Sequence, residues 1–347
     1  MMFFPLLLLV LLTTVVSGCR WIVFIGSQPF NPSGILVHAT HALIKQVDIQ
    51  QPVLPFLDQG LFHDDEKACV RNHRSNKDGW GIAWYDSQGH IHRNRSGLSA
   101  DTDPDFHMVA EDIVSKIVFG HIRAATVSKS SSTVNSHPFM YKNTLMWMHN
   151  GGIDRAGIES VFSERMRGLV YGTTDSEVAG GLFSQFLHDR ECNVEYEAHR
   201  FLSAMLLTIE ELKIKCGHSS MNFAVSDGSH IIATRFRSSI DEDPPSLYMT
   251  RGCDWDDSTE SMNDFSECDS FSFLIASEPV SRNNSDQWQL LLKDQLLYID
   301  TATGKHHLFC LSQACVTDAH FRNEISEYLS LENIGSFFRS AHGAKEQ

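Results

Sequence analysis

The sequence predicts a layered α+β fold. Strand-like runs dominate the first part of the chain, helical patterns follow in the middle, and strand-like runs return toward the end, without regular alternation of strand and helix. This grouping favours segregated layers over a doubly wound parallel sheet. Hydrophobic residues make up 42% of the chain, which is enough for a sizeable core. No internal repeat or evident linker divides the chain into smaller units.

Residues 1–18 are expected to be a secretory signal peptide. The run from Phe3 to Val16 is almost wholly apolar, and Val16 and Gly18 are small enough for the positions three and one before a cleavage site. The run is shorter than the roughly 20 residues of a membrane span, which favours cleavage over an uncleaved anchor. However, a basic segment before the run is missing. Val16-Ser17-Gly18-Cys19 also fits a lipoprotein site, where a lipid thioether would block the thiol.

Short apolar runs predict the first strands of the fold. They cover residues 20–26, 80–86, 117–123 and 145–149. The last of these strands ends at Asn150-Gly151-Gly152. Gly79 and Gly81 bracket Trp80, which indicates that the backbone closely approaches another segment there.

Helical periodicity marks the middle of the chain. It predicts helices over residues 105–115, 155–167 and 196–214. Thr174-Asp175-Ser176-Glu177 is a capping-box pattern, with Thr174 as the N-cap and Glu177 three residues later. We therefore expect a further helix to begin directly after Thr174.

The last part of the chain returns to strands. Residues 221–225 and 230–236 flank Asp227-Gly228, which is a strong hairpin signal. The acidic region 241–269 is expected to be a loop with one short strand near Leu247. Further strands are predicted over residues 271–276, 296–299 and 307–311. Residues 316–347 are expected to be a polar tail in which a short helix could form.

Charge and metal-ligand spacing exclude several classes of function. The net charge of −15 argues against nucleic acid and anionic membrane as partners. The polar stretch 51–77 carries His63, Asp64, Asp65 and His73, but their spacing fits no ligand template. We therefore predict a solvated loop there and no metal site.

The chain has eight cysteines, and their pairing depends on whether the protein resides in an oxidising compartment. Once Cys19 is set aside an odd number remains, so at least one of them is unpaired or bonds another chain. In an oxidising compartment Cys253 could pair with Cys268, and Cys310 with Cys315. Sequons for glycosylation begin at Asn94 and Asn283, which fits secretion.

Cys19 is the candidate nucleophile. Cleavage after Gly18 would place a thiol and a free α-amine on one residue, and their ordinary pKa values of about 8.5 and about 8 lie close to neutrality. The amine can then act as the general base for the thiol. An internal cysteine has only an amide nitrogen at this position, and an amide is not a base.

Three local patterns could recognise and activate a substrate. Arg123 at the end of a strand could clamp a carboxylate with two parallel hydrogen bonds. Asn150 and the N–H of Gly151 offer two donors for an oxyanion, and Asp175 at a helix start could pair with an amine. Taken singly, each has a structural interpretation, as an ion pair, a turn or a helix-dipole contact. Their order behind a nucleophilic cysteine favours the functional one.

Together these patterns resemble the class II glutamine amidotransferases, whose nucleophile is an N-terminal cysteine. The resemblance runs from Cys19 to about Leu311. It is carried by Cys19-Arg20-Trp21, Gly120-His121-Ile122-Arg123-Ala124-Ala125-Thr126, Asn135-Ser136-His137-Pro138-Phe139, His149-Asn150-Gly151 and Thr174-Asp175-Ser176-Glu177. Asp78-Gly79-Trp80-Gly81 and Ala276-Ser277-Glu278-Pro279 are similar to the stand-alone branch that includes a glutathione-degrading γ-glutamyl hydrolase component. Relatives usually carry the cysteine directly after the initiator Met, whereas here signal peptidase would have to expose it.

The resemblance implies an Ntn-hydrolase αββα four-layer sandwich over residues 19–315. It also implies roles for seven residues: Cys19 as nucleophile, Asn150 and Gly151 as oxyanion hole, Arg123 and Asp175 as partners of the substrate α-carboxylate and α-amino groups, Thr126 as a substrate contact, and His137 as a residue that orders the site. It implies no metal and no organic cofactor.

The expected function is hydrolysis of a γ-glutamyl amide, in glutamine or a γ-glutamyl peptide such as glutathione, through a thioester on Cys19. The expected location is secreted or in the lumen of the secretory pathway, with no membrane contact after cleavage. Ammonia would pass to solvent or to a separate partner subunit, which could also process the released peptide. The alternative is a secreted or lipid-anchored binding protein without catalysis on the same scaffold.

Overall fold

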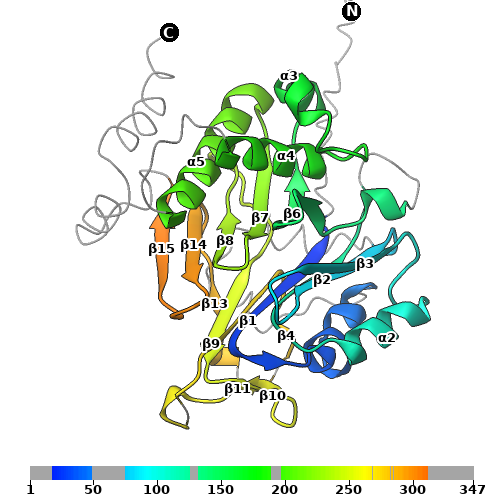
Figure 1. The fold of residues 1–347 in the computed structure, drawn as a ribbon, viewed down its shortest axis with the longest axis vertical. Helices are drawn as coiled ribbons and strands as arrows, with labels where there is room; N and C mark the ends of the chain where they lie inside the picture. Colours follow the sequence, from blue (N-terminus) through cyan, green and yellow to red (C-terminus); the bar gives the residue numbers. More distant parts are fainter. Residues whose placement is uncertain are drawn as a thin grey trace, which may run out of the picture.

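The computed structural model describes residues 18–48, 75–125, 132–188, 197–267, 269–281, 283 and 285–311 (Figure 1). The predicted signal peptide up to residue 17, most of the polar stretch 51–77, Thr126 and the tail 316–347 lie outside these ranges. Among the described helices, none combines the length and the apolar character needed to cross a membrane.

Two antiparallel sheets form the centre of the fold. The larger, called sheet A here, has the order β13 (Gln289–Leu290), β9 (Tyr248–Gly252), β12 (Ser272–Ala276), β1 (Arg20–Phe30), β4 (Ser115–Ile122), β2 (Trp80–Tyr85), β3 (Ile91–Ser96). Sheet B has the order β15 (His306–Cys310), β14 (Gln295–Asp300), β8 (His230–Arg235), β7 (Ser220–Ser226), β6 (Leu145–Gly152), β5 (Phe139–Tyr141). A separate pair consists of β10 (Trp255–Asp256) and β11 (Ser261–Met262).

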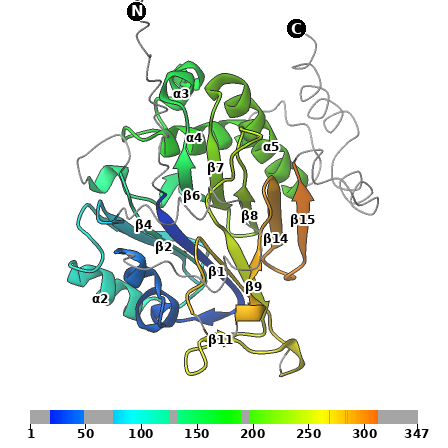
Figure 2. The same cartoon turned by 180° about the vertical axis from the view of Figure 1, so that it is seen from behind.

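Helices cover the outer face of each sheet. The α-helices are α2 (Pro104–Asp112), α3 (Arg155–Val161), α4 (Asp175–His188) and α5 (Glu197–Cys216). Single-turn helices are η1 (Gly34–His38), η2 (Leu43–Gln46), η4 (Thr133–Asn135), η5 (Glu164–Met166), η6 (Phe265–Glu267) and η7 (Ser285–Gln287). Figures 1 and 2 show α3, α4 and α5 gathered over sheet B, and α2 beside sheet A.

Three hydrophobic clusters define four layers. One lies between the two sheets, one joins sheet A to η1, η2 and α2, and one joins sheet B to α3, α4 and α5. In β1, Trp21, Val23 and Ile25 face the opposite sheet, whereas Ile22 and Phe24 face the outer cluster. A strand buried on both faces reads as a continuous apolar run, which explains the composition of β1. The predicted αββα sandwich is confirmed.

The start of α4 follows the predicted capping pattern only in part. The Thr174 hydroxyl accepts a hydrogen bond from the Glu177 N–H at 3.2 Å, as an N-cap residue does. The Glu177 carboxylate does not complete a capping box, because it accepts from the N–H groups of Tyr171 at 3.0 Å and Gly172 at 2.6 Å. Glu177 therefore fixes the loop that precedes α4.

Several boundaries differ from the prediction. β1 does not stop at Gly26 but continues to Phe30 after an irregularity in its pairing with β4. The helix predicted over 155–167 is broken, because Phe162 is extended and η5 forms a separate turn. The acidic region 241–269 contains β9, β10 and β11 rather than one short strand. Strands β3 and β5 were not predicted.

Four of the cysteines lie within the described ranges. Cys253 and Cys310 are disulfide-bonded, whereas Cys19 and Cys216 are free thiols. The partners that the sequence predicts, Cys268 and Cys315, lie outside the described ranges, so both pairings stay predictions. The sequon residues Asn94 and Asn283 are exposed.

Candidate active site

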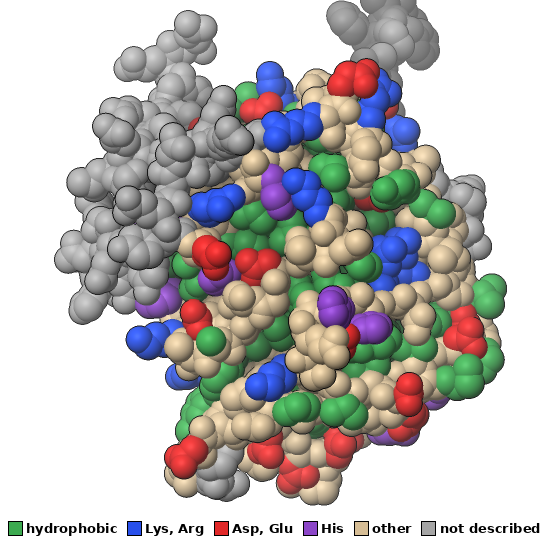
Figure 3. Space-filling view, viewed as in Figure 1, with side chains coloured by type: hydrophobic (Ala, Val, Ile, Leu, Met, Phe, Trp, Pro, Cys, Tyr) green, Lys and Arg blue, Asp and Glu red, His purple; other side chains and the backbone are tan. Residues whose placement is uncertain are grey.

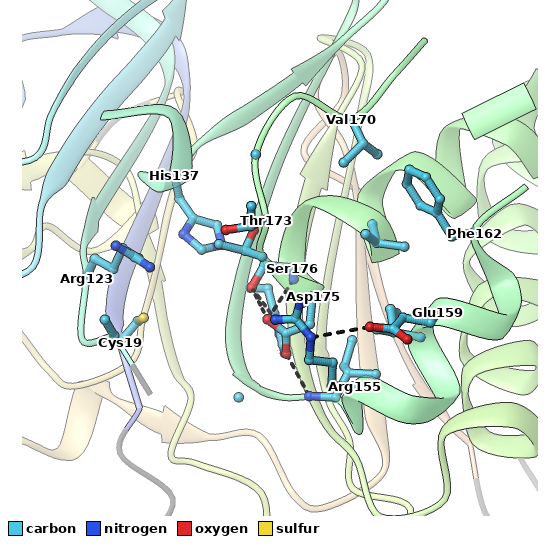
Figure 4. Close-up of a pocket in the computed structure, with 18 of the residues that line it drawn as sticks. Cys19, Arg123, His137, Arg155, Glu159, Phe162, Val170, Thr173, Asp175 and Ser176 are labelled. Atoms are coloured by element: carbon cyan, nitrogen blue, oxygen red, sulfur yellow. Dashed lines mark hydrogen bonds and ion pairs between the residues drawn. The ribbon is translucent and has the colours of Figure 1, made fainter. Parts of the chain in front are cut away.

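A cavity of about 450 Å³ contains most of the predicted site residues. Cys19 and Arg123 form one wall, and Asp175 and Ser176 face them from the start of α4 (Figure 4). Residues of α3, the Phe162 that follows it and the loop after η5 extend the cavity away from Cys19. The volume lies within the roughly 300–1,000 Å³ of small-molecule sites in proteins.

Cys19 directly precedes β1, which lies in the middle of sheet A between β4 and β12. Its thiol contacts the backbone of Ala124: the S–H donates to the carbonyl oxygen at 3.6 Å, and the sulfur accepts from the N–H at 3.4 Å. Burial raises the pKa of this thiol, while the Ala124 N–H and the charge of Arg123 act in the opposite direction. The thiol is thus held against the loop that follows β4.

Gly18 lies against the side chain of Asn150. A Cβ atom added to Gly18 would be 2.5 Å from the Asn150 Oδ1 atom. Nη1 of Arg20 donates to the carbonyl oxygens of Gly18 at 3.0 Å and Cys19 at 3.2 Å, and Arg20 also pairs with Glu278 at 3.7 Å. Asn150 is buried, and neither its Nδ2 nor its Oδ1 has a hydrogen-bond partner within the described part of the chain. An unpartnered buried carboxamide is costly and suggests a role toward a ligand.

Gly151 is required where β6 passes β7. Its φ of +152° and the Ser220 carbonyl oxygen, which would lie 2.2 Å from an added Cβ, strongly disfavour other residues. His149 fixes this region, since its Nε2–H donates to the same carbonyl oxygen at 2.8 Å and its Nδ1 accepts from the Ser176 hydroxyl at 2.9 Å. Burial lowers the pKa of His149, which keeps the ring neutral in these roles.

Arg123 is positioned by Asp78. Arg123 follows the last residue of β4, and its Nη1 donates to the Asp78 carbonyl oxygen at 3.3 Å. The Asp78 carboxylate accepts from the Ala125 N–H at 2.8 Å, and the Asp78 N–H donates to the Arg123 carbonyl oxygen at 3.0 Å. The Asp78 motif therefore holds the loop that presents the guanidinium to the cavity.

Asp175 joins the start of α4 to the end of β6. Its Oδ2 accepts from the Ile153 N–H at 2.8 Å, and its Oδ1 accepts from the Ser176 N–H at 2.9 Å. The carboxylate lines the cavity opposite Cys19 (Figure 4). Asp175 thus has a structural role in addition to the one predicted for it.

His137 is a buried part of the cavity wall and stacks on His121 at a ring-centroid distance of 4.0 Å. Burial lowers the pKa of His137, so its ring is neutral. The loop carrying it lies against two glycines: a Cβ on Gly81 would be 2.0 Å from the His137 carbonyl oxygen, and one on Gly79 would be 2.4 Å from the Ser136 hydroxyl. The close approach predicted around Trp80 is confirmed.

The structure thus brings six of the seven predicted site residues together. Cys19, Arg123, His137, Gly151 and Asp175 line the cavity, and Asn150 lies behind it against Gly18. Thr126 lies outside the described residues. Sequence reasoning did not assign to the site the cavity residues of α3 and the segments that follow it, which include Arg155, Glu159, Phe162 and Arg167. Within the described ranges, no group of three or more His, Cys, Asp or Glu could hold a metal ion.

One family model matches most of the chain, and two curated proteins are similar to it. The family described as "Glutamine amidotransferases class-II" matches residues 65–341. A probable glutamine amidotransferase of Saccharomyces cerevisiae, DUG3, is 27% identical in an alignment of 312 residues that covers 82% of this chain and 82% of that one. The gamma-glutamyl-hercynylcysteine sulfoxide hydrolase of Mycolicibacterium smegmatis is 28% identical over 159 residues, which are 46% of this chain and 61% of that one.

Solved structures give weaker similarity. A glutamine aminotransferase class-II domain protein from Silicibacter pomeroyi has a TM-score of 0.49 at 19% identity, covering 84% of this chain and 100% of that one. A predicted glutamine amidotransferase from Pseudomonas aeruginosa has a TM-score of 0.44 at 19% identity, covering 83% of this chain and 95% of that one.

Proposed function

The chain belongs to the class-II glutamine amidotransferases, and on this basis we propose that it hydrolyses a γ-glutamyl amide bond with Cys19 as an N-terminal nucleophile. The observation that carries the proposal is the cavity in which the Cys19 thiol lies with Arg123 on its own wall and Asp175 on the facing wall. Family membership supports an enzyme over a binding protein without catalysis. The similarity to a named γ-glutamyl hydrolase supports amide hydrolysis.

The two charged residues match the head of a γ-glutamyl substrate. The Arg123 guanidinium would bind the α-carboxylate, and the Asp175 carboxylate would bind the α-ammonium group. Opposite charges on the two sides of the cavity fix the direction of the substrate, so that its γ-carbonyl group reaches the thiol. Such positioning turns attack on the amide into an effectively intramolecular step.

The reaction then needs no group beyond the chain itself and water. The free α-amine of Cys19 takes the thiol proton, and the thiolate sulfur bonds to the γ-carbon. The carbonyl oxygen becomes an oxyanion that accepts from the Asn150 Nδ2–H and the Gly151 N–H. The α-ammonium group returns the proton to the departing nitrogen as the C–N bond breaks. Water then attacks the thioester, glutamate leaves, and the thiol is restored.

The position of Gly18 supports a requirement for cleavage of the Gly18–Cys19 bond before the enzyme is active. While Gly18 is attached, the nitrogen of Cys19 is an amide, and Gly18 lies against the carboxamide of Asn150 that the oxyanion needs. Removal of residues 1–18 supplies the base and clears that space in one step. We propose that signal peptidase makes this cut in the secretory pathway, and the disulfide bonds of Cys253 and Cys310 fit an oxidising compartment.

The test compares three forms of the protein: one that begins at Cys19, one with a single Gly before it, and one with Cys19→Ala at the N-terminus. Release of glutamate from glutamine and from glutathione is measured for each. Only the first form should be active, and alkylation with one label on Cys19 should abolish its activity. Equal activity of the Gly-extended form would remove the α-amine from the mechanism. The mass of the mature N-terminal peptide separates a free Cys19 from a lipidated one.

A further inference from the structure

Asn222 is a buried polar residue that the proposed mechanism does not yet use. It lies on β7, directly opposite Asn150 of β6 in the register of sheet B. Residues that lie opposite each other on antiparallel strands share one face of the sheet, with Cβ atoms about 4.5–5.5 Å apart. Ala224 and Met148, two residues away along each strand, belong to the cluster between the two sheets. Both carboxamides therefore also lie between the sheets.

The orientation of the Asn222 carboxamide is fixed by the loop before β9. Its Nδ2 donates to the carbonyl oxygen of Pro245 at 2.7 Å. A carbonyl oxygen can only accept, so this bond identifies the donor end of the amide. The buried Arg235 holds the same loop, because its Nε donates to the Pro245 carbonyl oxygen at 3.0 Å and its Nη2 to that of Pro244 at 2.9 Å. Asn222 Oδ1 is thus the free end, and it is buried without a hydrogen-bond partner among the residues that the structure describes.

Asn150 has the complementary need. Its Nδ2 carries two N–H donors, and a developing oxyanion would use one of them. In the chain with its leader attached, neither donor has a partner in the described ranges, and Gly18 lies against the carboxamide. Figure 3 shows acidic and basic side chains intermixed at the surface, whereas both asparagines are buried. An interior of this kind holds an amide at low cost only when its donors and acceptors are paired.

We propose that Asn222 is the positioning residue for Asn150. Once Gly18 is removed, Asn222 Oδ1 accepts one N–H of the Asn150 Nδ2, and the second N–H is aimed at the oxyanion. The inference rests on the proposed function and adds a residue to it. A donor contributes most to the rate when it is already oriented before charge develops. Without Asn222 the Asn150 carboxamide could turn, and its donor would be aimed at the oxyanion for only part of the time.

Two substitutions remove the acceptor without leaving a backbone carbonyl unpaired. Asn222→Leu keeps the size and branching of the side chain, and Asn222→Ala shortens it. In both variants the Pro245 carbonyl oxygen keeps its bond from Arg235. We expect each variant to lower kcat by about fivefold to twentyfold and to leave KM within about twofold, because the donor is misaimed but the substrate head keeps its partners.

The experiment is a double-mutant cycle on the form that begins at Cys19. Glutamate release from glutamine and from glutathione gives kcat and KM for the wild type, each Asn222 variant, Asn150→Ala, and each combination of the two. Because Asn222 acts through Asn150, its substitution should change kcat by less than about twofold in the Asn150→Ala background. Running the cycle with both Asn222 variants means that one folded variant is enough.

Thr234→Val is the matched control for a purely structural disturbance of β7. The Thr234 hydroxyl accepts from the Phe223 N–H at 3.0 Å and donates to the Met221 carbonyl oxygen at 2.7 Å, on either side of Asn222. Thr234 lies on the helix-covered face of β8 that Ile232 shares, away from the asparagine pair. The control should lower the free energy of urea unfolding but keep kcat within about twofold.

The results separate the positioning role from the proposed function. A loss of kcat that is the same with and without the Asn150 side chain would refute the positioning role, and so would a raised KM at unchanged kcat. Wild-type kcat in both Asn222 variants would refute it as well. In each of these cases the wild type still releases glutamate, so the proposed function stands. No glutamate release by the wild type would refute the proposed function and the positioning role with it.

Discussion

Gly151→Ala tests whether the close packing of β6 against β7 supports both the stability of the fold and the rate of the reaction. The added methyl group would lie 2.2 Å from the Ser220 carbonyl oxygen and 2.8 Å from Nε2 of His149, at a φ of +152° that disfavours alanine. Overpacking of this kind costs about 1–3 kcal/mol, and the backbone strain costs about 1–3 kcal/mol more. We therefore expect a loss of about 2–6 kcal/mol in the free energy of unfolding.

The same change should also displace the Gly151 N–H from the oxyanion. Loss of one such donor lowers kcat by about 10²–10³. The assay is urea unfolding followed by circular dichroism, together with glutamate release by the fraction that remains folded. Gly152→Ala is the control, because no atom lies within 4 Å of its added Cβ. It should leave both stability and kcat close to wild type. A Gly151→Ala protein with wild-type stability and wild-type kcat would refute the reasoning.

Three further predictions concern single side chains. Asn150→Ala should lower kcat by about 10²–10³ with little change in KM, and poor binding with normal turnover would instead make Asn150 a structural residue. Arg123→Lys and Asp175→Asn should each raise KM at least about tenfold. Lysine lacks the guanidinium fork, and asparagine leaves the charge of the ligand without a partner. Wild-type kinetics in both variants would disprove the assigned pocket. Burial opposes the charge of His230, but the hydrogen bond and charge of Asp227 outweigh it and raise the pKa of His230 above 6.5. This pair stabilises the fold below about pH 6.5 and loses its contribution as the pH rises through the raised pKa, so Asp227→Asn should reduce the free energy of urea unfolding more at about pH 5.5 than at about pH 9. An equal loss at both pH values would contradict this account of the pair.

Much of the fold could be predicted because local patterns and tertiary environment agree. The β7–β8 hairpin at Asp227-Gly228 and the N-cap Thr174 follow from turn and capping chemistry that needs no distant partner. The motif order also led us to expect Cys19, Arg123 and Asp175 in one place, and they line one cavity. Their catalytic roles stay predictions.

The remaining features depend on contacts that a single sequence does not display. The helix predicted over 155–167 ends at Val161, although the helical pattern continues beyond it. Arg155 and Arg167 look like ordinary surface residues in the sequence and enter the cavity only because α3 and η5 lie beside the start of α4. Asp78 belongs to a recognisable motif, but its bond to the Ala125 N–H joins two segments 47 residues apart.

The position of β1 has a consequence for the order of events during synthesis. The ribosome makes β1 before any other strand, yet Ile22 pairs with Ala276 of β12 near the end of the domain. Such distant pairing forms late, because a long loop must close first. One edge of β1 therefore stays open until almost the whole chain has left the ribosome. During this interval the Gly18–Cys19 bond is accessible, whereas in the finished fold Gly18 lies against Asn150. For the cleavage after Gly18 that we propose, this order of pairing favours a cut during translocation, before the sheet closes around Cys19.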